Sequence, residues 1–262
     1  MNKTEGNIIC SNLHYFYYDT DFFFEKMKEN GVSCVELYAG TPHIFIDRKY
    51  TDDFSQVKQS ADEAGVRITD IRPETMSFRY HLCSLDDEWN ESSIASYKNV
   101  IDFAAAIGAE SVNTNISGAF RDCAYETVLD RVCENLKILA DYAEKRNVFL
   151  TVESESCDNQ GFIRTAEQLI NVKKRVASEA LRFGINTDAL AESGESLGEW
   201  KKAFGDKIRY IRFSSIEAYS SLSTEIADEK MESADKIFFL MDDKYLDKPY
   251  EADRELKENI WD

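Results

Sequence analysis

Residues 31–45, GVSCVELYAGTPHIF, decide the fold prediction. The glycine at the start of this stretch suits the end of a helix, because glycine adopts the left-handed conformation that a helix C-terminus needs. The apolar run 32–37 predicts a short strand that carries one acid, Glu36, and a small turn with His43 follows it. A helix that leads through glycine into a strand with a polar C-terminal end is typical of one repeating unit of an α/β barrel.

The same alternation extends along the chain in both directions. Strands are predicted at 7–11, 33–37, 67–71, 111–115, 149–153, 182–187, 208–213 and 236–241. Helices are predicted at 22–30, 54–64, 91–107, 124–145, 166–176 and 197–204, with weaker patterns at 223–232 and 249–261. Eight such alternations in one chain favour a closed (β/α)8 TIM barrel.

The pattern indicates a single barrel domain over residues 1–262, with no linker or low-complexity segment. An open doubly wound sheet is the alternative, but that fold usually carries a glycine-rich phosphate-binding turn, and the chain has neither GxGxxG nor GxxxxGK[ST]. Residues 214–236 are short for a loop, a helix and a return loop, so we expect the last βα units to be trimmed.

Composition limits the classes of partner. The formal net charge of −18 repels nucleic-acid backbones and anionic lipid surfaces, so neither nucleic acid nor membrane is expected as a partner. None of the six cysteines forms a CxxC pair, and no apolar run is long enough to span a bilayer. The N-terminal text also lacks a signal-peptide pattern. A reducing cytoplasm with structural thiols is therefore the expected setting.

Polar residues follow the predicted strands, at the edge where barrel enzymes place their chemistry. The candidates, in chain order, are His14, Glu36, His43, Glu74, Asn115, Glu153, Asp188, Arg212 and Asp242. Glu153 is the sharpest of them, because it ends the apolar run FLTVE and a buried carboxylate needs a metal, a cation or a proton.

Several of these residues have a structural interpretation as well. Glu153 also fits a plain ion pair with a neighbouring arginine, and each histidine also fits a packed, hydrogen-bonded side chain. Asp242 also fits the start of a solvated loop. The aromatic run at 14–24, HYFYYDTDFFF, suits a barrel cap, a subunit interface of a homo-oligomer, or a stacking surface for a sugar ring.

The chain resembles the xylose isomerase-like TIM barrels of the sugar phosphate isomerase/epimerase superfamily, near the fructoselysine and ketose 3-epimerases. The stretches that carry the resemblance are those at 31–45, 73–75, 93–112, 134–153 and 204–213. The resemblance implies a divalent metal (Mn, Mg, Co or Zn) held by a Glu, an Asp, a His and a Glu at the ends of strands five to eight. It also implies proton transfer beside a carbonyl by the two glutamates.

Carried onto this sequence, the metal pattern fails after its first position. Glu153 matches the first ligand, but the second falls on Asn186, the third on Arg212, and the fourth on Leu240, Met241 or Asp242. A guanidinium cannot ligate a cation. We therefore expect no metal cofactor, and we expect Arg212 to occupy the metal's space and pair with Glu153.

Two hypotheses about function follow. The first is an isomerase or epimerase that acts on a small carbohydrate, with Glu153 and Asp242 as catalytic groups. In it, His14, Glu36, His43, Glu74, Asn115, Asp188 and Arg212 contact the substrate. The alternative is a non-catalytic pseudoenzyme that binds a sugar, regulates, or serves as a subunit. A DNA-repair endonuclease of the same fold is disfavoured by the 3 histidines and the acidic charge.

Overall fold

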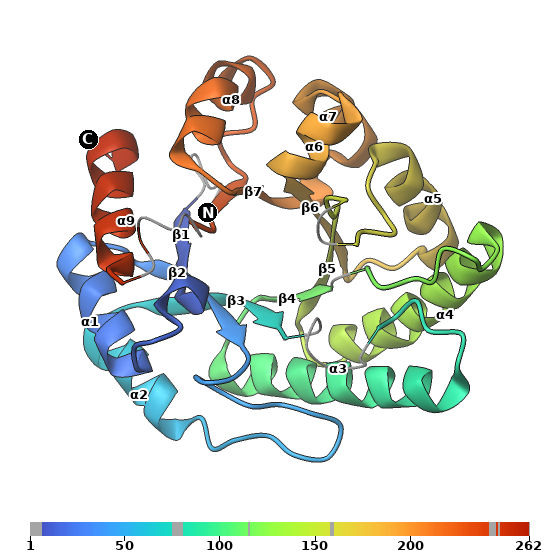
Figure 1. The fold of residues 1–262 in the computed structure, drawn as a ribbon, viewed down its shortest axis with the longest axis horizontal. Coiled ribbons are helices and arrows are strands. Elements are labelled where there is room, and N and C mark those ends of the chain that lie inside the picture. The colour runs from blue at the N-terminus through green and yellow to red at the C-terminus, as the bar shows by residue number, and fades with distance from the viewer. Residues whose placement is uncertain are drawn as a thin grey trace.

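Eight parallel strands close into a barrel in the order of the chain, and β8 pairs with β1 to complete it (Figure 1). The computed structural model describes residues 7–74, 81–114, 116–157, 160–240, 245 and 247–261. The strands are β1 (Ile8–Ser11), β2 (Cys34–Ala39), β3 (Arg67–Pro73), β4 (Ser111–Thr114), β5 (Phe149–Glu153), β6 (Leu181–Asn186), β7 (Ile208–Phe213) and β8 (Asp235–Phe238). The predicted TIM barrel is confirmed, and the open sheet is excluded.

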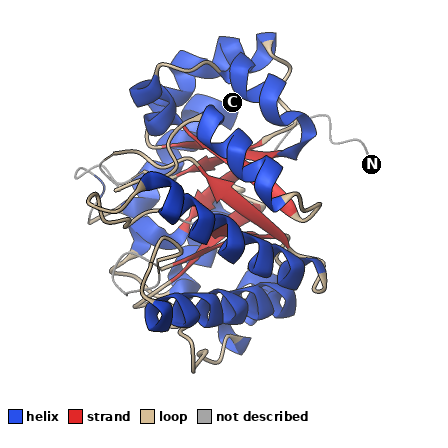
Figure 2. Cartoon of the chain, turned by 90° about the vertical axis from the view of Figure 1, so that its right-hand side faces the viewer, coloured by secondary structure: helices blue, strands red, loops and turns tan. Residues whose placement is uncertain are grey.

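Helices surround the strands on the outside of the barrel (Figures 1 and 2). They are α1 (Thr20–Asn30), α2 (Ser55–Ala64), α3 (Asp87–Ile107), α4 (Tyr125–Glu144), α5 (Ala166–Val176), α6 (Thr187–Ser193), α7 (Leu197–Phe204), α8 (Ile216–Asp228) and α9 (Pro249–Leu256). Short 3₁₀ helices η1 (Asn12–Tyr15) and η2 (Gly205–Lys207) and a π-helical turn η4 (Lys257–Trp261) complete the described elements. Gly31 ends α1 with φ 74°, in the left-handed conformation that the sequence predicts.

The last part of the barrel corrects two expectations. The segment expected to be trimmed contains the 13-residue helix α8 and the first two residues of strand β8. It fits because only two residues separate β7 from α8. The predicted helix at 223–232 is therefore displaced, and α8 begins at Ile216 instead. The helix α6 was not predicted, because its seven residues follow β6 directly and are too few for a periodic pattern.

Alternation along the strands separates two apolar regions. Cys10, Val35, Ile211 and Phe238 belong to the large core between strands and helices. Their neighbours Ile9, Cys34, Tyr210 and Ile237 form a second, small cluster. Since successive side chains of a strand point to opposite faces, this small cluster fills the barrel interior. Two residues further along β2 and β7, the same interior face carries Glu36 and Arg212.

A second ionic network lies near the N-terminal ends of the strands and is centred on Arg209 of β7. Its Nη2 atom is 2.9 Å from Asp70 Oδ2 and 3.1 Å from Glu110 Oε2, and its Nη1 atom donates to Asp235. Asp70 is fully buried, and its Oδ1 atom has no hydrogen-bond partner within the described residues. Burial raises the pKa of Asp70 to about 6, although Arg209 opposes the shift.

The cysteines are present as thiols, as the sequence analysis expects. All six cysteines are free, and Cys10, Cys34, Cys83 and Cys133 are buried. No helix in the described part of the chain combines the length and the apolar character that a membrane span requires.

Asp70 should make the protein less stable as the pH rises from about 4 to 6. The folded state holds the Asp70 proton up to about pH 6, whereas the unfolded chain releases it near pH 4, so folding is favoured most at low pH. The Asp70→Asn variant should lack this loss, which amounts to about 2–3 kcal/mol. Urea unfolding of both proteins between pH 4.5 and 7 measures the difference. The exposed Asp62→Asn change is the matched control, and parallel stability curves for wild type and Asp70→Asn would contradict the expectation.

Candidate functional site

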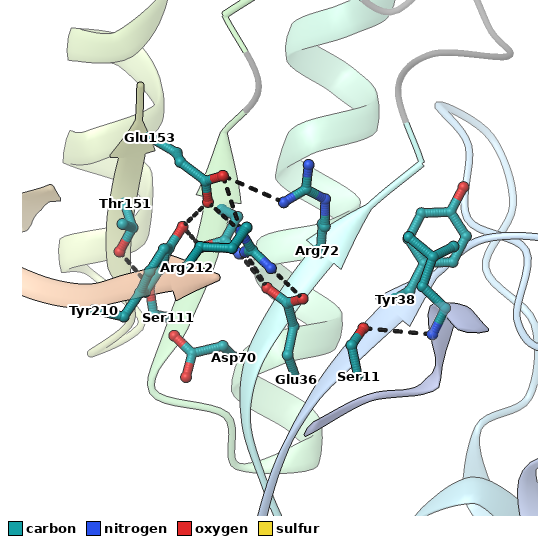
Figure 3. A network of polar contacts seen from close by, with 12 residues as sticks. Ser11, Glu36, Tyr38, Asp70, Arg72, Ser111, Thr151, Glu153, Tyr210 and Arg212 are labelled. Atoms are coloured by element: carbon teal, nitrogen blue, oxygen red, sulfur yellow. Dashed lines mark hydrogen bonds and ion pairs between the residues drawn. The ribbon is translucent and has the colours of Figure 1, made fainter. Parts of the chain in front are cut away.

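Arg212 lies between two buried glutamates at the C-terminal end of the barrel interior (Figure 3). Its Nη1 and Nη2 atoms donate to Oε2 and Oε1 of Glu36 at 3.0 and 2.6 Å. Its Nε atom donates to both oxygens of Glu153, at 2.9 and 2.8 Å. Every nitrogen of the guanidinium is therefore engaged. The ion pair predicted between Arg212 and Glu153 is present, and Glu36 is a second partner that the sequence analysis did not assign to it.

Two further side chains extend this bridge into a ring of polar contacts. Asn113 of β4 donates from Nδ2 to Glu36 Oε1 at 2.6 Å. The Tyr210 hydroxyl lies 2.9 Å from Asn113 Oδ1 and 2.5 Å from Glu153 Oε2, to which it donates. We call Glu36, Asn113, Glu153, Tyr210 and Arg212 the Arg212 ring. It joins β2, β4, β5 and β7 across the barrel.

A glycine in β6 makes room for the tyrosine of this ring. Gly184 pairs with Tyr210 in register, and a Cβ atom at Gly184 would lie 2.5 Å from the Tyr210 ring. A residue with a side chain would therefore displace Tyr210, which explains a glycine inside an otherwise apolar strand.

Burial makes the charges of the Arg212 ring interdependent. Glu36, Glu153 and Arg212 are at most 3% exposed. Burial alone would raise the pKa of Glu153, but Arg212, Arg72 and the Tyr210 hydroxyl more than offset it and hold that pKa below its usual range. Burial likewise disfavours the charged form of Arg212, yet Glu153 and Glu36 keep its pKa well above normal. Glu153 is thus an ionised carboxylate that is stabilised in that form.

Glu153 also receives weaker contacts from its neighbouring strand β6 and from β3. Asn186 of β6 donates from Nδ2 to Glu153 Oε1 at 3.4 Å, and Arg72 of β3 places Nη1 3.6 Å from the same oxygen. The Arg72 side chain is 18% exposed and makes no hydrogen bond to any described residue. Arg72 therefore has N–H groups at the barrel mouth that donate to none of the described residues.

Two of the positions that the resemblance assigns to metal ligands, Asn186 and Arg212, have other hydrogen-bond partners in the structure. Asn186 stands at the second ligand position, but its Oδ1 atom accepts from the N–H groups of Asp188 and Ala189 and caps α6. Arg212 fills the third position with a permanent positive charge. Within the described residues no group of three or more His, Cys, Asp or Glu side chains is placed to hold a metal ion.

Both candidate histidines are engaged in packing contacts. His14 of η1 places Nε2 3.2 Å from Asp253 Oδ1 on α9, and the Tyr15 hydroxyl donates to the other oxygen of that carboxylate. The His43 ring lies between Asn12 Nδ2, at 2.9 Å from Nδ1, and the Tyr18 carbonyl, at 2.8 Å from Nε2. Since a carbonyl only accepts, Nε2 of His43 carries the proton and Nδ1 accepts from Asn12.

The other candidates lie apart from the ring or outside the described residues. Glu74 accepts a hydrogen bond from the Thr41 backbone at 3.3 Å, and Asp188 is exposed and accepts from Ser214 at 2.6 Å. Asn115 and Asp242 are not among the described residues. Of the predicted site residues that are described, the structure brings Glu36, Glu153 and Arg212 together.

Three side chains of this site were not assigned a role from the sequence. They are Arg72, Asn113 and Tyr210. A usable signal existed for Tyr210, which lies two residues before Arg212 and therefore on the same face of β7. Asn113 and Arg72 likewise precede predicted site residues, Asn115 and Glu74, by two positions.

Known proteins share this architecture. The sequence model of the family described as xylose isomerase-like TIM barrel matches residues 24–228 of the chain. Fructoselysine 3-epimerase of Shigella flexneri is 23% identical over 188 residues, which are 72% of this chain and 68% of that protein. A probable endonuclease 4 of Haloarcula marismortui is 25% identical over 174 residues, 66% of this chain and 60% of that protein.

Solved structures are similar over nearly the whole chain. D-Psicose 3-epimerase from Clostridium cellulolyticum H10 superposes with a TM-score of 0.76 at 14% identity, covering 97% of this chain and 98% of that one. The 3-keto-D-glucoside 4-epimerase from E. coli gives a TM-score of 0.77 at 11% identity, covering 97% and 99%. At such low identity these likenesses concern the fold alone.

Removing the Arg212 charge should destabilise the protein strongly. The Arg212→Met variant leaves two buried carboxylates without their cation, so we expect a loss of about 3–5 kcal/mol in unfolding free energy. Adding Glu36→Gln and Glu153→Gln to that variant should restore most of the loss, because no buried charge remains. Chemical denaturation measures both. The control is Arg131→Met, which breaks a pair with the exposed Asp87 and should cost under about 1 kcal/mol. Equal losses for Arg212→Met and the control would contradict the role of the ring.

Proposed function

Since the chain belongs to the xylose isomerase-like TIM barrel family, we propose that it binds a small carbohydrate at the C-terminal mouth of its barrel without metal-dependent proton transfer. The chain has epimerase relatives, so the proposal concerns what its own mouth residues do. In this proposal the family's catalytic positions serve as a fixed ionic frame under a ligand site.

The Arg212 ring is the observation that carries this proposal. A general base works best when its pKa lies near the working pH and its oxygens are free to take a proton. Glu153 meets neither condition, because both of its oxygens accept from Arg212 and its pKa is held below the usual range. Protonation of Glu153 would also leave part of the Arg212 charge uncompensated in a buried site.

Two features support a carbohydrate as the ligand. The relatives named above as epimerases carry sugars in their names. In this chain, Phe16 and Tyr17 directly follow η1 and are 47% and 72% exposed. Their rings contact each other edge to face with centroids 5.7 Å apart. Exposed aromatic rings beside polar groups offer a surface on which the apolar face of a sugar ring stacks.

A metal-independent epimerase is the second candidate, and Arg72 is the observation that favours it. Its guanidinium is partly exposed beside Glu153 and keeps donors unused within the described residues. In this alternative, Arg72 stabilises the negative charge that develops on a carbonyl oxygen, and Glu153 takes the neighbouring proton. The two candidates differ in whether a bound sugar exchanges a carbon-bound proton.

Incubation with ketoses in D₂O separates the two candidates. We expect a ketohexose or its phosphate to raise the melting temperature while no deuterium enters a carbon position, with or without added Mn²⁺. Proton NMR of the recovered sugar measures exchange. Exchange by wild-type protein that disappears in Glu153→Gln would overturn the non-catalytic proposal and establish the alternative. If none of the sugars changes the melting temperature, the proposal that the ligand is a carbohydrate is wrong.

Metal analysis provides an independent test. After dialysis against Mn²⁺ or Co²⁺, we expect less than stoichiometric metal and no change in melting temperature, because Arg212 repels a cation at Glu153. The Asn186→Asp/Arg212→His variant supplies the carboxylate and imidazole that the family pattern requires, so it should be stabilised by either metal. The same variant with Glu153→Gln is the control and should not respond. Stoichiometric metal in the wild type that is lost in Glu153→Gln would show that Glu153 binds a metal ion and would contradict the proposal.

A further inference from the structure

A cavity of about 770 Å³ lies between the loops that follow β4 and β5 and the first turns of α4 and α5. The two loops are fastened to each other, because Ser117 and Gly161 form an antiparallel bridge and the Phe162 N–H donates to the Ile116 carbonyl at 2.9 Å. A volume of this size suits a small-molecule ligand. No member of the Arg212 ring lines the cavity, so the cavity is distinct from that ring.

Aromatic rings form the apolar part of the cavity wall. Phe120 lines it with 70% of its surface exposed, which is high for a large apolar side chain. Tyr125, at the start of α4, stacks on Phe162 with ring centroids 4.9 Å apart and an angle of 29° between their planes. These three rings present planar surface to a ligand that carries a ring of its own.

Two arginines form the polar part, and one of them has an unsatisfied donor. Arg164 is positioned by Glu192, whose Oε2 atom lies 3.1 Å from its Nη2 atom. The Nε atom of Arg164 is buried and has no hydrogen-bond partner among the described residues. Arg121 is exposed and forms no ion pair or hydrogen bond with the described part of the chain. A buried N–H without an acceptor is costly, and the Arg164 side chain as a whole is 41% exposed, so its guanidinium group can meet a ligand.

The charge of this wall contrasts with the rest of the molecule. The chain carries 49 acidic residues against 31 basic ones, yet none of the described lining residues is Asp or Glu. Glu192 accepts from both Arg164 and the Cys157 N–H and compensates part of the Arg164 charge, whereas Arg121 has no such partner among the described residues. The wall is therefore a local positive site on a strongly acidic protein, and local positive sites attract anions.

We infer that this cavity binds a small aromatic anion, with its ring against Phe120, Tyr125 and Phe162 and its carboxylate or phosphate on Arg164 and Arg121. The Arg164 Nε–H group supplies one charge-assisted hydrogen bond and the Arg121 guanidinium supplies the others. This inference does not rest on the proposed function, because the two sites share no residue discussed here.

Ligand-observed NMR with four probes tests the inference on the full chain. Phenyl phosphate and phenylacetate carry both a ring and an anionic group, and their comparison distinguishes a phosphate from a carboxylate ligand. Inorganic phosphate lacks the ring, and phenyl β-D-glucoside lacks the charge. We expect at least one of the first two to bind at least tenfold more tightly than either of the last two.

Variants then locate the bound probe. Arg164→Gln, Arg121→Gln and Phe120→Ser should each weaken it at least fivefold, and Arg131→Gln on the far side of α4 is the matched control. Absence of binding by both aromatic anions at 10 mM would overturn the inference. Binding that is lost in Arg72→Gln but kept in Arg121→Gln and Arg164→Gln would overturn it as well, because the probe would then occupy the barrel mouth.

Discussion

One buried guanidinium pairs with two buried carboxylates at the C-terminal end of the barrel interior, and Arg72 brings a second cation to within 3.6 Å of Glu153. Glu36 and Glu153 come from β2 and β5, and Arg212 reaches both from β7. A charge without a partner in such a place would cost several kcal/mol. Asn113 donates a further hydrogen bond to Glu36 and Tyr210 donates one to Glu153, so both carboxylates have partners besides Arg212.

The acidic interior explains why an arginine at this position has consequences for function. A metal ion and a guanidinium both neutralise carboxylates, but they differ chemically. A metal accepts electron pairs from substrate oxygens and exchanges its ligands, whereas a guanidinium only donates hydrogen bonds along fixed directions. Each nitrogen of Arg212 is committed to Glu36 or Glu153, so under the proposed function a ligand would be recognised by other groups, such as Arg72.

Other arginines of this chain differ in the number of acidic side chains that surround them. Arg209 repeats the arrangement of Arg212 at the opposite end of the barrel, where it ties Asp70, Glu110 and Asp235 together. Arg121 and Arg164 instead line a cavity wall without acidic residues. Arg209 is enclosed by three carboxylates, whereas Arg164 pairs with Glu192 alone and Arg121 has no ion-pair partner among the described residues.

The sequence by itself determined the barrel, most strand positions, the glycine that ends α1, and the importance of Glu153 and Arg212. These depend on local patterns: apolar periodicity, turn residues, and a charge inside an apolar strand. Sequence patterns placed α8 seven residues late and missed α6, because short helices leave little periodicity. Only the tertiary structure decided that Arg212 reaches Glu36 as well as Glu153, and that His14 pairs with Asp253 while His43 lies between Asn12 and the Tyr18 carbonyl. Those pairings depend on barrel closure and strand register, which bring residues more than a hundred positions apart into contact, as with the 176-residue separation of Glu36 and Arg212.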